Sequence, residues 1–81
     1  MNHTNLGFAL IHKIEHDLAE VVVNEGVELD MIMLSQYHQW IEQNLTDPCF
    51  LLINKINRYT YTFEAQQNLV ALDKVKAIAI V

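Results

Sequence analysis

The chain has 81 residues, of which 52% are hydrophobic and 19% charged, and its ten acidic against five basic residues give a formal net charge of −5. This composition is too apolar for a disordered chain, and it lacks the basic stripe of a nucleic-acid-binding protein. The length allows a single domain, residues 1–81, and the apolar runs are far shorter than the roughly 20 residues of a membrane-spanning helix. Cys49 is the one cysteine, so no internal disulfide can form, and no signal-peptide pattern opens the chain. We therefore expect a soluble cytoplasmic protein without stable membrane insertion.

Residues 7–24 admit two interpretations. Several of their apolar residues fit one helical face, but the segment from Phe8 to Ile14 also shows the alternation of a strand. The β-branched run Val21-Val22-Val23 disfavours a helix. We therefore predict a hairpin, with strands at about 7–14 and 18–24 and a turn at His16-Asp17.

The clearest helix is predicted from about Asp30 to Leu45, after a turn at Asn24-Glu25-Gly26. Its apolar residues recur at helical spacing, Asp30 can cap its start, and the break at Thr46-Asp47-Pro48 ends it. On the other side of this break, residues 49–53 form an uninterrupted apolar run. Such a run is typical of a strand in a parallel sheet that is buried on both faces.

The last third of the chain predicts a helix and a strand. After a polar loop, Thr60 or Thr62 can cap a helix at about 63–72, and residues 75–81 read as a buried final strand. The predicted order is ββαβαβ, which indicates an α/β fold with a mixed, mostly parallel sheet and helical crossovers. An apolar strand at the very end suggests two alternatives: the 81 residues are part of a longer domain, or a partner covers that strand. We favour the first, a fragment of a longer domain.

Charge is unevenly distributed. Residues 1–50 carry eight carboxylates and one lysine, whereas residues 51–81 carry four cations and two carboxylates. The plainer interpretation is a solvated surface. The sharper one is an anion-attracting corner at Lys55 and Arg58, which would lie at the carboxyl end of a parallel strand and beside the backbone N–H groups near Thr62.

No catalytic or metal-binding motif is recognisable. His12 and His16 are four residues apart, but on strands they would stand about 13 Å from each other, and no further ligand completes a set. Cys49 begins an apolar strand, so we expect it to be buried and inert. The chain has no glycine-rich phosphate loop and no nucleophile elbow. We therefore predict no catalytic residue, no metal and no cofactor.

The most unusual local feature is the alternation of tyrosine and threonine at residues 59–62. The plainer interpretation is an extended approach to a capped helix, with the rings of Tyr59 and Tyr61 covering the sheet edge. The functional interpretation is a recognition or switching loop. Phosphorylation of Thr60 or Thr62 would place nearly two negative charges at the start of a helix, beside Arg58.

Together these features resemble the STAS fold of sporulation anti-sigma factor antagonists. The chain is more closely similar to a largely uncharacterised group of small bacterial proteins classed as STAS-like or SEC14-like. The stretches that carry the resemblance are residues 21–28, 51–55, 59–66 and 75–79.

This resemblance implies a domain that continues with at least one more helix. In the antagonists a serine after the third strand, commonly preceded by aspartate, is phosphorylated by a partner kinase. Residues 49–81 contain no serine, and Asn54 and Asn57 stand where an acid is expected. Thr60 and Thr62 are then the candidate phosphoacceptors by position.

We expect from these observations a non-enzymatic regulatory or protein-interaction domain that binds a protein partner or a second copy of itself. Its predicted partner- or anion-binding residues are Lys55, Arg58, Tyr59 and Tyr61. The alternative is a small-ligand binding protein that holds an anionic or lipid-like molecule between its helices and its sheet.

Overall fold

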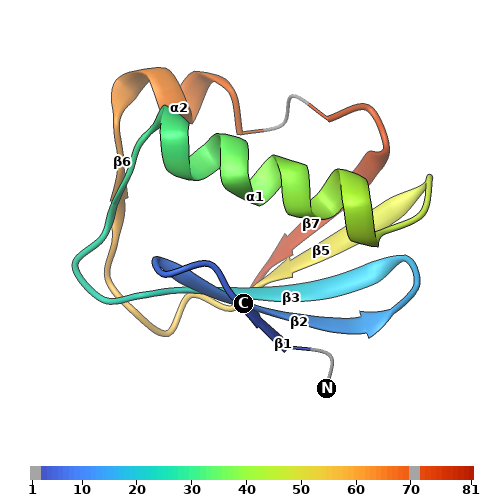
Figure 1. Cartoon of the computed structure of the whole chain (residues 1–81). Coiled ribbons are helices and arrows are strands. Elements are labelled where there is room, and N and C mark those ends of the chain that lie inside the picture. Colours follow the sequence, from blue (N-terminus) through green and yellow to red (C-terminus); the bar gives the residue numbers. More distant parts are fainter. Residues whose placement is uncertain (1–2, 70–71) are drawn as a thin grey trace.

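A computed structural model describes residues 3–69 and 72–81. The described chain is mixed α/β: a five-stranded sheet has the order β1-β2-β3-β5-β7, and the short strands β4 and β6 pair separately. Both helices lie on the same side of the large sheet (Figure 1). The elements are β1 (His3–Asn5), β2 (Ala9–Glu15), β3 (Leu18–Val23), β4 (Glu28–Leu29), α1 (Met31–Asn44), β5 (Cys49–Ile53), β6 (Thr60–Tyr61), α2 (Phe63–Gln67) and β7 (Val75–Ile80).

The predicted hairpin is confirmed. β2 and β3 pair antiparallel, with Ile11 opposite Val21, and the chain turns at His16-Asp17. The side chains of β3 alternate between the two faces of the sheet, which is why this segment forms a strand and not a helix. Ala19, Val21 and Val23 are buried, while the residues between them are not. Before this hairpin lies the short strand β1, which was not predicted and which pairs antiparallel with β2, with His3 opposite His12.

The predicted long helix is confirmed as α1. Asp30 has an extended backbone, and its carboxylate accepts a hydrogen bond from the Met33 N–H at 2.9 Å, which satisfies a donor left free at the helix start. Leu34, Trp40 and Ile41 are buried against the sheet. The helix ends where Leu45 returns to an extended conformation.

The predicted parallel pairing of β5 and β7 is confirmed, but the predicted burial of these two strands is not. β5 pairs parallel with both β3 and β7, as two helical crossovers require. The prediction that β5 is buried on both faces is wrong, because Phe50 is 37% exposed on the face that no described helix covers. The prediction of a buried final strand is also wrong: Ile80 in β7 is 70% exposed.

The second helix is shorter than predicted. α2 runs from Phe63 to Gln67, whereas the sequence predicted a helix to about residue 72; of that stretch, residues 70 and 71 lie outside the described residues. Thr62 is the capping residue, since its hydroxyl oxygen accepts a hydrogen bond from the Ala65 N–H at 3.1 Å. Thr60 instead lies in β6.

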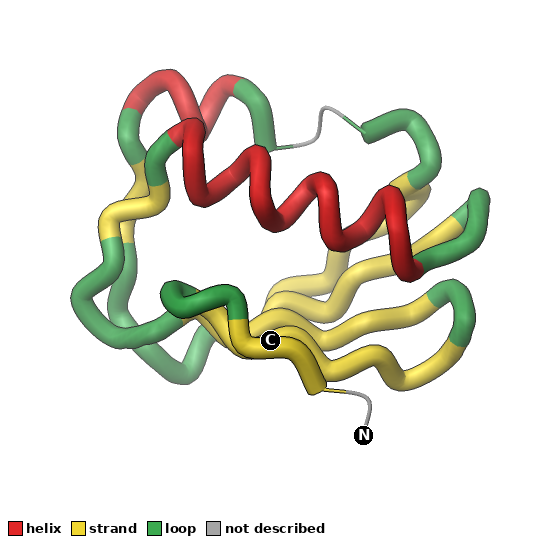
Figure 2. Tube along the Cα trace, viewed as in Figure 1, coloured by secondary structure: helices red, strands yellow, loops and turns green. Residues whose placement is uncertain are grey.

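The short strands β4 and β6 belong to the two crossovers, β4 to the one from β3 to β5 and β6 to the one from β5 to β7. They pair parallel, with Glu28 opposite Thr60 and Leu29 opposite Tyr61. Figure 2 shows this small ladder beside the ends of both helices and apart from the large sheet. It brings residues 58–62, which the sequence analysis singled out, next to the start of α1.

The longest helix among residues 3–69 and 72–81, α1, has 14 residues, and none of their helices is long and apolar enough to cross a membrane.

Candidate functional site

An apolar cavity of about 260 Å³ lies between the sheet and α1, and Leu69, which follows α2, also lines it. Its floor comes from the carboxyl-terminal halves of β3, β5 and β7, at Val23, Ile53 and Ile80, and Leu34 of α1 forms part of its roof. Open α/β sheets bind ligands at the carboxyl ends of their parallel strands. The full lining is Phe8, Ala9, Val21, Val23, Leu29, Leu34, Tyr37, Ile53, Tyr59, Tyr61, Leu69, Ile78 and Ile80.

Three tyrosines supply the polar groups of this lining. Tyr37 comes from α1, Tyr61 from β6, and Tyr59 from the loop before β6. The Tyr61 hydroxyl donates to the Tyr59 hydroxyl at 3.4 Å, and the two rings meet edge to face with centroids 5.6 Å apart. Edge-to-face packing places the positive edge of one ring against the negative face of the other, which holds the pair in a defined orientation.

The phenols of Tyr37 and Tyr59 remain protonated over the physiological range. Burial raises the pKa of Tyr37 well above its usual value, and the neighbouring phenols of Tyr61 and Tyr59 raise it further. Burial, followed by the hydrogen bond with Tyr61, likewise raises the pKa of Tyr59. A neutral phenol in apolar surroundings is a hydrogen-bond donor and acceptor, so the cavity can orient a polar group on a bound molecule.

The predicted residues Lys55 and Arg58 lie outside this cavity, in an open cleft formed by the β5–β6 loop and the turn at Glu25-Gly26. The Arg58 N–H donates to the Glu25 carboxylate at 3.1 Å, and the Gly26 N–H donates to the Arg58 carbonyl at 2.7 Å. Gly26 has a φ of +79°, a conformation that favours glycine. These bonds fix the backbone of the loop and leave the Arg58 side chain exposed.

Tyr59 separates the two spaces. Its side chain is only 8% exposed and lines both the cavity and the cleft. From the cleft side, the Lys55 ammonium lies 4.8 Å from the centre of the Tyr59 ring, within the range of a cation–π interaction. Sequence reasoning grouped Lys55 with Tyr59 and Tyr61 as one surface; in the structure Lys55 faces outward while the tyrosines face inward.

The two candidate phosphoacceptors differ in their surroundings. Thr60 is exposed in β6, and its N–H donates to the Val27 carbonyl at 3.0 Å. Thr62 is half-buried, and its hydroxyl oxygen is already occupied in capping α2. Since α2 has only five residues, the predicted contribution of a helix dipole to anion binding here is small.

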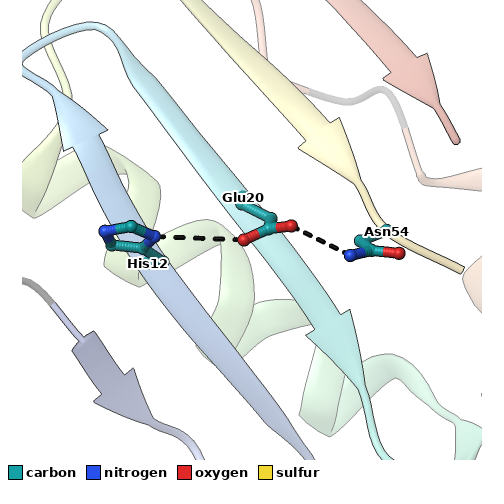
Figure 3. Close-up of polar contacts among 3 residues, drawn as sticks. All are labelled: His12, Glu20 and Asn54. Carbon is teal, nitrogen blue, oxygen red and sulfur yellow. Dashed lines mark hydrogen bonds and ion pairs between the residues drawn. The ribbon is translucent and has the colours of Figure 1, made fainter. Parts of the chain in front are cut away.

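The open face of the sheet carries a short polar chain. Figure 3 shows Glu20 of β3 between His12 of β2 and Asn54, which follows β5. The Asn54 amide donates to the Glu20 carboxylate at 3.0 Å, and His12 Nδ1 lies 3.9 Å from its other oxygen. The ring of His3 stacks on His12 at 4.3 Å. No described Ser, Cys or Thr side chain is hydrogen-bonded to this imidazole, so the group does not form a nucleophile–base pair.

Two further kinds of site that the sequence analysis considered, a reactive cysteine and a metal site, find no support in the described residues. Cys49 is fully buried in β5, and burial raises the pKa of its thiol, which disfavours a reactive thiolate. Within the part of the chain that the structure describes, no three His, Cys, Asp or Glu side chains gather in a way that could hold a metal ion.

Sequence reasoning did not find the cavity. Most of its lining residues, such as Val21 and Leu34, have the apolar character and spacing of ordinary core positions. The one local signal was the tyrosine/threonine alternation, which places Tyr59 and Tyr61 on the inner side because side chains of alternate residues in an extended segment point the same way.

Searches with this sequence and structure against family models, curated proteins and solved structures returned no match.

Proposed function

We propose that this domain binds a small, mostly apolar molecule in the cavity beneath α1 and performs no chemical step on it. The observation that carries the proposal is the apolar cavity with three tyrosines in its lining, two of which are hydrogen-bonded through their hydroxyls. Ligand sites are typically apolar cavities with a few convergent polar groups. For comparison, an engineered apolar cavity of about 150 Å³ in another protein binds benzene.

The cavity volume limits the size of the ligand. At the packing density of a protein interior, ~0.74, a space of this size holds about 190 Å³ of van der Waals volume, or roughly a dozen non-hydrogen atoms. At about 0.5 kcal/mol per atom, a ligand of that size would bind with a Kd on the order of 10–100 μM. A thermal-shift and NMR titration series with neutral phenols, indole and straight-chain alcohols is the direct test.

Filling the cavity should abolish this binding. We expect Ile53→Phe to weaken binding of the best alcohol or phenol by at least tenfold, because the added ring occupies the floor of the cavity. Leu52→Phe is the matched control: it adds the same bulk one residue earlier in β5, on the opposite face of the sheet. Isothermal titration calorimetry measures both affinities. Equal affinities for Ile53→Phe and the unchanged protein would contradict the proposal.

A second candidate function, self-association through β7, has its own supporting observation. Within residues 3–69 and 72–81, β5 is the one strand that pairs with β7, and the side chains from Lys76 to Ile80 are exposed. A six-residue apolar edge strand without proline is a template for pairing. Antiparallel pairing of two copies about Ile78 would oppose Ala77 with Ala79 and Ile78 with itself, so side chains of equal size would face each other.

Proline at position 78 tests this pairing. The N–H and C=O of Val81 both bond to the β5 side, so by alternation the backbone groups of Ile78 point away from β5. Ile78→Pro should therefore keep the sheet and convert dimer to monomer, whereas Ile78→Val should preserve the dimer. Light scattering after size exclusion at two concentrations reports the mass. A wild-type chain that is monomeric throughout would exclude this function.

The STAS-like assignment remains part of the proposal. A mixed sheet with helical crossovers is compatible with that fold, and the sequence resemblance at residues 21–28 and 59–66 supports it. It would make the chain a bacterial, cytoplasmic regulatory domain, with Thr60 or Thr62 as phosphoacceptor.

A further inference from the structure

We infer that the ligand of the cavity is a monocarboxylate: an apolar body of about ten atoms fills the cavity, and its carboxylate lies at Tyr59, on the side of Lys55 and Arg58. This inference rests on the proposed function and adds the chemical class of the ligand. It follows from the position of Tyr59, which alone among the described residues lines both the apolar cavity and the cationic cleft.

The inner side of this boundary offers hydrogen-bond donors. The hydroxyls of Tyr59 and Tyr61 lie 3.4 Å apart, and Tyr37 completes the group from α1. A hydroxyl pair can turn both protons toward an acceptor that enters between them. Hydrogen bonds from neutral donors to a charged oxygen are stronger than those between neutral groups, so a carboxylate would gain more here than an alcohol.

The outer side offers compensating charge. The Lys55 ammonium lies 4.8 Å from the centre of the Tyr59 ring, so a carboxylate at the edge of this ring would be close enough for attraction in the reduced dielectric of the site. The Arg58 side chain is exposed in the same cleft. The opposing charge in the cleft is Glu25, whose carboxylate already accepts the Arg58 N–H.

The floor and roof of the cavity leave no place for a second charged group on the ligand. Among residues 3–69 and 72–81, those that line the cavity are apolar or tyrosine, and none is Asp, Glu, Lys, Arg or His. A dianion or an ionic group at the far end of the molecule would be buried without a partner, at a large cost. The cavity volume also excludes molecules with two long chains.

Octanoate, 1-octanol and octylamine test the inference, because they share one apolar chain and differ in the charge of the head group. We expect octanoate to bind at least fivefold more tightly than octanol, and octylamine to bind most weakly, by calorimetry below their micellar concentrations. Octanol binding as tightly as octanoate would overturn the carboxylate inference and leave the proposed function standing. No binding by any of the three, or by the phenols, would overturn both.

Two lysine variants locate the head group. Lys55→Met keeps an apolar stem but removes the charge, and we expect it to weaken octanoate five- to tenfold without changing octanol. Lys76→Met is the matched control: it removes the same charge near the other end of the parallel strands and should change neither affinity. An unchanged octanoate affinity in Lys55→Met, or an equal loss for octanol, would overturn the placement at Tyr59.

Discussion

Ile41→Ala is expected to lower the free energy of unfolding by about 3 kcal/mol, within the range of 2–5 kcal/mol for deleting a buried isoleucine side chain. Ile41 is 1% exposed and joins α1 to the core around the sheet. A domain of this size is only marginally stable, so such a loss removes a large share of its total stability. Urea denaturation measures the effect as a lower midpoint at an unchanged slope.

Ile32→Ala in the same helix is the control for Ile41→Ala. Ile32 is 71% exposed, and alanine has the higher helix propensity, so we expect a change within about 0.5 kcal/mol. A loss as large as that of Ile41→Ala would mean that the exposed side of α1 is covered in solution.

The second large effect is expected in β5, where neighbouring residues face opposite sides of the sheet. Leu51 is 3% exposed and faces α1, so Leu51→Lys would bury an unpaired ammonium and should prevent stable folding. Leu52 lies on the open face, directly opposite Glu20. Leu52→Lys should therefore fold, at a cost below about 1 kcal/mol. Circular dichroism with thermal unfolding separates the two outcomes.

The same pair tests whether the open face is free in solution. Equal failure of Leu52→Lys and Leu51→Lys would contradict a solvent-facing β5 and would indicate that a second copy covers Phe50 and its neighbours.

The order of the main elements could be predicted because each carries a strong local signal. Asp30 and the break at Pro48 bound a helix whose apolar residues repeat regularly, and the run Val21-Val22-Val23 identifies a strand. The short β1, β4 and β6 could not be predicted. Two- or three-residue strands are too short to show a pattern of their own and depend on their partner, which for β4 and β6 is far along the chain, as when Leu29 pairs with Tyr61.

Burial of the parallel strands was predicted wrongly for a physical reason. An uninterrupted apolar run such as residues 49–53 indicates hydrophobic side chains on both faces, but it does not say whether helices cover both. Here both helices lie on one side, so Phe50 remains exposed. Of the candidate site, the sequence identified Lys55, Arg58 and residues 59–62. It did not show that the tyrosines line a cavity while Lys55 and Arg58 lie in a separate cleft, because the cavity forms only when distant elements pack together.

The two crossovers share the same order of elements. Each crossover leaves a strand of the large sheet, adds one short strand, caps a helix with a polar side chain and returns parallel: Asp30 opens α1 in the first unit, and Thr62 opens α2 in the second. The two units differ mainly in helix length. At 1.5 Å per residue, α1 is about 21 Å long and α2 about 7.5 Å. The second crossover therefore supplies much less helix to cover the sheet than the first, and the cavity is lined by Leu34 and Tyr37 of α1 but by none of residues 63–67.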